Sequence, residues 1–220
     1  MTFSILARDP NSGAIGGAAA TGSLCVGGWV LRGDPRAGMS ASQGASPSTM
    51  WGEDALTALR SGQSAGDAVR GVTNADEGRA HRQLSALGLS GPGASFTGAA
   101  NTPAMGSLDI TEGIVAGNML ANETVLDAMA EGYLAAKGRF ADRLLASLHT
   151  AENAGSDMRG LQSAALLIMS RDQAPLTLRI DFDETPLDAL DALYARATSG
   201  DYAEWSRQVP TLTNPGRILD

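Results

Sequence analysis

Thr2 is the residue of this sequence that is best placed to act as a nucleophile, because removal of Met1 would make it the first residue of the chain. A threonine hydroxyl is a weak nucleophile and needs a base beside it. A free α-amine has a pKa of about 7.7–8.0, so the amine of an N-terminal threonine can serve as that base. Methionine excision is favoured by a small second residue, and threonine is one. The residue is also typical of an ordinary β-strand, so the chemistry depends on the loss of Met1.

Side chains that hold metals or act with a cysteine nucleophile are scarce in this chain. His81 and His149 are the only histidines, and neither is followed four positions later by a ligand-type residue. Metal sites need a cluster of such residues, so we expect none. Cys25 is the only cysteine, and its apolar neighbours are more typical of a core residue than of a Cys–His pair. The glycine-rich segments lack the features of a phosphate-binding loop, so we expect no cofactor.

The elements that must position Thr2 begin with a β-hairpin. Residues 2–8 and 14–21 have strand-like patterns, and the segment Asp9–Gly13 between them carries turn residues. If Arg8 pairs with Ala14, then Thr2 lies opposite Ala20, and the loop of residues 21–25 passes near Thr2. Arg8 is six residues along the strand from Thr2, about 20 Å at ~3.3 Å per residue, so we expect it to lie outside the same site.

The remaining elements are grouped by type along the chain. Helical patterns follow the strands in pairs, at residues 49–60 and 65–72 and again at 122–136 and 139–153, and a last helix is predicted at 186–197. Residues 27–35 are interpreted as a glycine-rich crossing, and the chain after residue 197 as coil. Grouped elements favour an α+β fold with antiparallel sheets and outer helices over a doubly wound parallel sheet. We expect one domain spanning residues 1–220.

Composition narrows the functional classes. The chain has 220 residues, 43% of them hydrophobic, and a formal net charge of −8. Nucleic-acid binding needs a basic surface, so the charge argues against it, and it also disfavours anionic membranes. No membrane-spanning apolar run or secretion signal is evident, and a single cysteine does not indicate an oxidising compartment, so the expected location is the cytoplasm.

Four motifs resemble one known family, in the same order. They are TFSILARDP at residues 2–10, FTG at 96–98, GNML at 117–120 and GSDMRGLQSAAL at 155–166. The family is an uncharacterised bacterial and archaeal one, domain of unknown function 1028, which is grouped with the N-terminal nucleophile (Ntn) hydrolases. The resemblance covers roughly residues 2–193. It implies a four-layer αββα sandwich of two mainly antiparallel sheets.

The resemblance also implies amide hydrolysis through an acyl-enzyme. Thr2 would attack, its own amine would carry the proton, and backbone N–H groups would hold the oxyanion. Asp157 and Arg159 would orient the amine or bind a substrate carboxylate; the alternative is an ion pair that braces the loop. Asn118 would donate to the oxyanion, or else be a turn residue with positive φ. Ser23 and Gln43 are candidates for the wall of the site from their positions alone.

The sequence does not specify the substrate. The resemblance implies a small amide or peptide-like bond, and some relatives are fused to a peptidoglycan-binding domain, which suggests cell-wall amides. The rival interpretation is a non-catalytic module that binds a ligand or mediates assembly on the same fold. A homo-oligomer is compatible with either interpretation.

Overall fold

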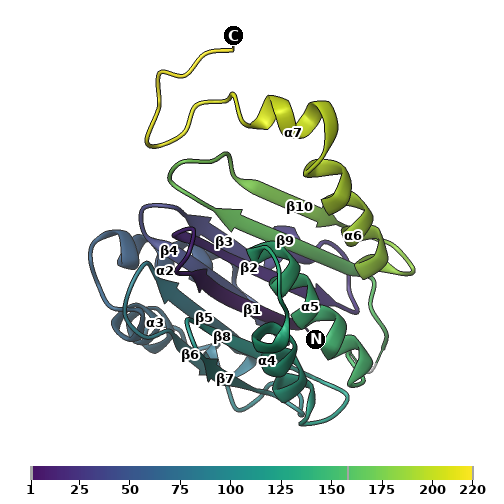
Figure 1. Cartoon of the computed structure of the whole chain (residues 1–220). Helices are drawn as coiled ribbons and strands as arrows, with labels where there is room; N and C mark the ends of the chain where they lie inside the picture. The colour runs from purple at the N-terminus through teal and green to yellow at the C-terminus, as the bar shows by residue number, and fades with distance from the viewer. Residues whose placement is uncertain (1, 158, 220) are drawn as a thin grey trace.

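The N-terminal hairpin forms the centre of a six-stranded antiparallel sheet. A computed structural model describes residues 2–157 and 159–219, and its larger sheet has the order β10-β9-β2-β1-β8-β7 (Figure 1). The strands of this sheet are β1 (Thr2–Asp9), β2 (Ala14–Thr21), β7 (Gly106–Ile110), β8 (Gly113–Asn118), β9 (Ser163–Met169) and β10 (Leu176–Ile180). A second antiparallel sheet has the order β3-β4-β5-β6, with β3 (Leu31–Asp34), β4 (Gly38–Gly44), β5 (Arg82–Gly88) and β6 (Ala94–Thr97).

Helices cover the outer faces of both sheets. The pair α2 (Thr49–Arg60) and α3 (Ala65–Asn74) packs on the smaller sheet, whereas α4 (Val125–Ala135), α5 (Phe140–Asn153) and α6 (Pro186–Ala197) pack on the larger one (Figure 1). Shorter elements are α1 (Val26–Trp29), the 3₁₀ helix η1 (Arg79–His81) and α7 (Gly200–Ser206). Among the described residues, no helix has both the length and the apolar character needed to cross a membrane. The predicted class, with antiparallel sheets and outer helices, is confirmed.

The alternation of side chains along β1 divides the core. Phe3 and Ile5 are fully buried in a cluster that includes residues of α4, α5 and α6. Leu6 belongs to a different cluster, which it shares with Met39 and Leu87 of the smaller sheet. Because successive side chains of a strand point to opposite faces, Thr2 lies on the same face as Leu6. Thr2 therefore faces the layer between the two sheets.

The register of the hairpin differs by one residue from the prediction. Asp9 pairs with Ala14 and Phe3 pairs with Ala20, so the prediction that Thr2 lies opposite Ala20 is wrong. The turn is shorter than expected because Asp9 stays in the strand. Gly13 closes the turn with a φ of +70°, and its N–H donates a hydrogen bond to the Asp9 carbonyl at 2.8 Å. Continuing the register brings Thr2 opposite Thr21.

Three other segments differ from the predictions. Residues 27–35 form the end of α1 and strand β3 rather than an irregular crossing. Strand β7 was not predicted, and the predicted C-terminal coil contains α7. The predicted helices at 49–60 and 186–197 have the same bounds in the structure, and Ser64 caps α3 by accepting the Asp67 N–H at 3.1 Å.

Asp9 gives the hairpin a pH-dependent anchor. Burial raises the pKa of Asp9, but hydrogen bonds from Ser12 and the charge of Arg143 outweigh burial and hold the pKa below its usual range. The Ser12 hydroxyl donates to this carboxylate at 2.6 Å, and an Arg143 N–H donates at 2.9 Å. A lowered pKa in the folded state means that ionised Asp9 stabilises the fold above the unfolded pKa of about 3.9.

We expect Asp9→Asn to lower the free energy of unfolding by about 1–2 kcal/mol at pH 7, because it removes a charge from these hydrogen bonds. The difference from the wild type should close as the pH falls through the folded-state pKa, below about 4. Urea unfolding at pH 7 and pH 3 measures this, with the exposed Asp109→Asn on β7 as the control. An equal difference at both pH values would contradict the proposed anchor.

Candidate active site

The layer between the sheets changes from apolar to polar along its strands. Near the hairpin turn it is filled by residues such as Leu6, Ile15, Met39 and Leu87. At the opposite end the inner faces carry polar side chains, all at most 7% exposed: Thr2, Ser4, Thr21, Gln43, Gln83, Ser85 and Asn118. Buried polar groups are costly unless they are paired or used. This polar end of the layer is the candidate site.

Thr2 is held between neighbouring strands at this end. Its Oγ1 donates a hydrogen bond to Thr21 Oγ1 on β2 at 3.1 Å. On the other side Thr2 pairs with Asn118 of β8. From the smaller sheet, Gln43 Nε2 donates to the Thr2 carbonyl at 3.4 Å. The structure therefore brings together three of the predicted residues, Thr2, Gln43 and Asn118.

Gln83 links these residues across the two sheets. Its Oε1 accepts hydrogen bonds from Gln43 Nε2 at 2.6 Å and from Asn118 Nδ2 at 3.2 Å. Its Nε2 donates to the Gly117 and Gly106 carbonyls, both at 2.9 Å, and lies 2.8 Å from Thr97 Oγ1. Gln83 was not among the residues predicted from the sequence. The signal in the sequence was its alternation with Ser85 and Leu87, which places all three on one face of a strand; its complete burial is evident only in the structure.

Two buried oxygens beside Thr2 have no donor among the described residues. They are Gln43 Oε1 and Asn118 Oδ1, and the inner-face hydroxyls of Ser4 and Ser85 are also without a partner. Leaving such a group unpaired costs about 1–3 kcal/mol, so each one calls for an explanation. Unpaired acceptors at this position favour a hydrogen-bond donor that arrives when the site is complete.

The position of Asn118 in the structure rules out one of the two roles predicted for it from the sequence. It was interpreted either as an oxyanion donor or as a turn residue with positive φ, but it ends β8 as a fully buried strand residue. The positive φ, 59°, belongs to the next residue, Met119. The turn-residue interpretation is therefore wrong, while the amide of Asn118 lies inside the candidate site.

Asp157 and Arg159 brace the loop that follows β2. The Asp157 carboxylate is completely buried and accepts the Gly22 N–H at 2.7 Å and the Arg159 N–H at 2.8 Å. The Arg159 guanidinium adds contacts of 3.1 and 3.2 Å, and its side chain is 44% exposed. A bridge between Asp157 and Leu120 also joins this loop to the chain that leaves β8.

Ser23 and Met1 complete the set of predicted residues. Ser23 is exposed on the loop after β2, and its carbonyl accepts a hydrogen bond of 2.7 Å from the Ser163 hydroxyl. Its side chain is therefore on the rim of the site rather than in the buried cluster. Met1, whose removal the threonine chemistry requires, lies outside the described residues.

Several loops at the Thr2 end contain a non-glycine residue in the left-handed conformation. Four non-glycine residues of the described chain have positive φ, and three of them, Cys25, Met119 and Ser156, belong to the loops at the Thr2 end. Such conformations cost of order 1–3 kcal/mol each and cluster at functional sites. Cys25 is one of these residues, with a φ of 61°.

Other candidates lie elsewhere. Arg8 forms an ion pair with Glu112 at 2.7 Å at the hairpin-turn end of β1. It thus lies far from Thr2, as predicted. His149 contacts Asp191 at 2.8 Å on the helical face, between α5 and α6. Within residues 2–157 and 159–219, no three His, Cys, Asp or Glu side chains are grouped so that they could hold a metal ion.

Comparison with known proteins identifies the family. Residues 2–190 match the model of a family described as a family of unknown function, DUF1028. The chain belongs to this family. The crystal structure of protein SPO2555 from Silicibacter pomeroyi, which carries the DUF1028 designation, is 58% identical, with a TM-score of 0.96 over 100% of this chain and 96% of that one. No functionally curated protein matches significantly. The family predicted by resemblance is confirmed.

The close contact between Gly22 and Asp157 in this DUF1028 chain leaves no room for a side chain at position 22. A Cβ at Gly22 would overlap the Gly160 carbonyl and lie 2.5 Å from Asp157 Oδ2. We expect Gly22→Ala to lower the free energy of unfolding by about 1–3 kcal/mol, because the brace must shift.

The matched control is Gly71→Ala in α3, where nothing lies within 4 Å of the added carbon. Alanine is the better helix former, so this variant should be more stable than the wild type by about 0.5–1 kcal/mol. Thermal and urea unfolding of both variants measure these differences. Equal stability of Gly22→Ala and Gly71→Ala would refute the prediction that the brace requires glycine at position 22.

Proposed function

We propose that this protein is an N-terminal nucleophile amidohydrolase, in which Thr2 is the nucleophile and its α-amine the base once Met1 has been removed. One observation carries the proposal. Thr2 is 7% exposed, and its hydroxyl donates to Thr21 and faces a buried polar cluster at the end of the central strand. A strand threonine without a role would not need this surrounding of buried amides.

The proposed reaction begins with attack of Thr2 Oγ1 on the carbonyl carbon of an amide substrate. The hydroxyl proton passes to the α-amine, and the C–N bond breaks as the amine returns that proton to the leaving nitrogen. An ester between Thr2 and the acyl group remains. Water, activated by the same amine, then hydrolyses the ester and restores the hydroxyl. Backbone N–H groups hold the oxyanion, and no cofactor is needed.

The unpaired acceptors support the role of the amine. During attack the α-amine becomes an ammonium group, which is a donor of three hydrogen bonds. Gln43 and Asn118 both adjoin Thr2 and each carries a buried oxygen without a donor. Acceptors at such positions stabilise the protonated amine and fix its direction. Gln83 keeps both side chains in place through its single carbonyl oxygen.

The loop brace supports a small or peptide-like amide as substrate. Both carboxylate oxygens of Asp157 already accept hydrogen bonds within the loop. We therefore assign Asp157 a positioning role rather than contact with the Thr2 amine. Arg159 is anchored by Asp157 yet remains partly exposed, which suits recognition of a substrate carboxylate. Ser23 would line the rim beside it. Cell-wall amides are one substrate class with these features.

The packing of the chain supports the same assignment. Two antiparallel sheets share an inner cluster, and helices cover each outer face, which supports an αββα sandwich. Thr2 begins a central strand of that arrangement. The N-terminal nucleophile fold is thus part of the proposal, together with the reaction.

Labelling by a β-lactone tests the proposal directly, because an activated Thr2 would open the lactone and retain it as an ester. We expect one label per wild-type molecule, located on Thr2 by peptide mass spectrometry. Thr2→Ala should lose labelling by at least about a thousandfold, since it lacks the nucleophile. Alanine is also small at the second position, so methionine excision is unchanged. Thr177→Ala, at an exposed position of β10, is the matched control and should label normally.

Two outcomes would overturn the assignment. Labelling that persists in Thr2→Ala would place the nucleophile elsewhere. A correctly processed wild-type protein that never labels and hydrolyses no amide would instead favour the rival function, a ligand-binding or assembly module.

A further inference from the structure

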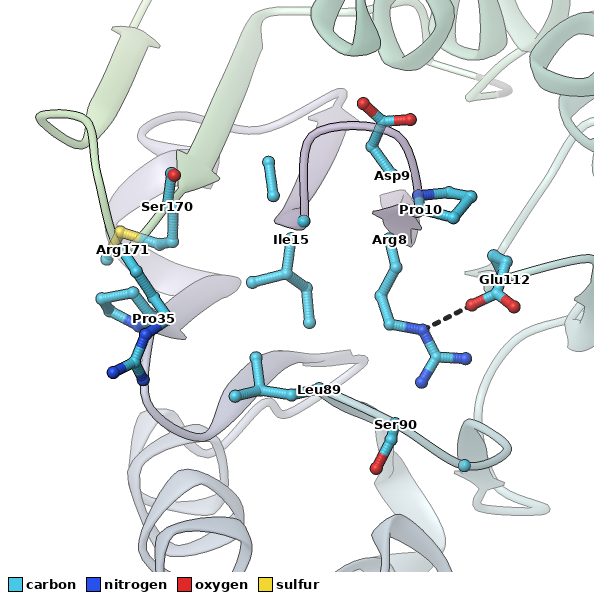
Figure 2. Close-up of a pocket in the computed structure, with 14 residues that line it drawn as sticks. Arg8, Asp9, Pro10, Ile15, Pro35, Leu89, Ser90, Glu112, Ser170 and Arg171 are labelled. Carbon is cyan, nitrogen blue, oxygen red and sulfur yellow. Dashed lines mark hydrogen bonds and ion pairs between the residues drawn. The ribbon is translucent and has the colours of Figure 1, made fainter. Parts of the chain in front are cut away.

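A pocket lies at the end of β1 opposite to Thr2. It has a volume of about 350 Å³ and is formed by the β1–β2 turn, the end of β9 and the segment after β5 (Figure 2). Pockets of about 300–1,000 Å³ accommodate small molecules. Arg8 and Thr2 are six residues apart on one strand, about 20 Å, so the pocket is separate from the candidate active site.

The pocket has an arginine on each of two sides, and the carboxylates of Asp9 and Glu112 also belong to its lining. On one side Arg8 donates from Nε to Glu112 at 2.7 Å and from Nη1 to the Gly88 carbonyl at 3.3 Å, while Nη2 has no partner among the described residues. On the other side lies Arg171, whose exposed guanidinium makes no ion pair within the described chain (Figure 2). A hydrogen bond joins the backbone of Arg171 to the C-terminal segment, since its carbonyl accepts the Thr213 N–H at 3.0 Å.

Apolar side chains lie between the two arginines. Ile15 and Leu89 lie between Arg8 and Arg171 in the close-up, and Pro35 and Met169 also contribute to the lining (Figure 2). Leu89 is 43% exposed although it is a large aliphatic residue. An apolar surface flanked by guanidinium groups suits a ligand with an apolar body and an anionic end.

We propose that this pocket binds a small monocarboxylate with an apolar body, such as an aromatic or branched acid. A carboxylate accepts two parallel hydrogen bonds from a guanidinium, and two arginines supply such donors here. Asp9 and Glu112 in the lining would repel a doubly charged phosphate more strongly than a singly charged carboxylate, which favours the carboxylate. Glu112 offsets the charge of Arg8 and Arg143 offsets that of Asp9, so Arg171 is the lining arginine whose charge is left for a ligand among the described residues. The proposal is independent of the reaction assigned to Thr2.

Titration with 2-naphthoate, followed by its fluorescence and by calorimetry, tests the proposal. We expect one saturable site on the full-length protein, with 2-naphthamide and inorganic phosphate each binding at least about tenfold more weakly. Arg171→Met should weaken naphthoate binding at least about tenfold without affecting the fold, because the side chain is exposed and makes no ion pair. Leu89→Asp should abolish binding by adding an anion to the apolar wall.

The controls separate this pocket from other anion contacts. Arg70→Met changes the same charge on the far helix α3, and Thr2→Ala removes the proposed nucleophile; both should bind naphthoate like the wild type. Equal binding of naphthoate and naphthamide, or unchanged binding in Arg171→Met, would overturn the proposal. Tighter binding of phosphate than of naphthoate would also overturn it.

Discussion

The carboxamide of Gln83 is the interaction on which the geometry around Thr2 depends. It spans the layer between the sheets at the point where that layer stops being filled by apolar side chains. One oxygen receives the amides of Gln43 and Asn118, and one nitrogen reaches the carbonyl of Gly117 on β8. Hydrogen bonds in such a buried, low-dielectric place are strong when satisfied and costly when not. Polar contacts therefore hold the two sheets together at the Thr2 end, and hydrophobic packing holds them together at the hairpin-turn end.

This division gives the central strand two chemically different ends. At its start, Thr2 meets buried amides and unpaired acceptors, an environment suited to a group that changes its protonation state. At the end of the strand, Arg8 pairs with Glu112 and Asp9 pairs with Arg143. The pocket next to them is lined partly by apolar side chains. The loops at the Thr2 end carry most of the backbone strain among the described residues, whereas the hairpin end satisfies its tight turn with a glycine. The two ends of β1 thus differ in the kind of polar contact that surrounds them, with buried amides at one end and ion pairs at the other.

Much of the framework could be predicted from the sequence, because periodicity and capping act locally. The helices at 49–60 and 186–197 and the hairpin strands follow from such patterns. The hairpin register could not be predicted, since Asp9 suits both turn and strand, and contacts with the distant Arg143 decide between them. Gln83 was missed because a glutamine in a strand looks like a surface residue until the second sheet covers it. Strand β7 is mostly exposed and depends on β8, and α7 is too short for a helical period to be evident.

The central claim is that the amine of Thr2 is free in the working protein. The most direct measurement is the intact mass and N-terminal sequence of the protein purified from its native host. The account predicts a chain that begins at Thr2, lighter than the full sequence by one methionine residue. Retention of Met1 in essentially every molecule would contradict it, because an amide nitrogen at Thr2 has no lone pair with which to act as a base.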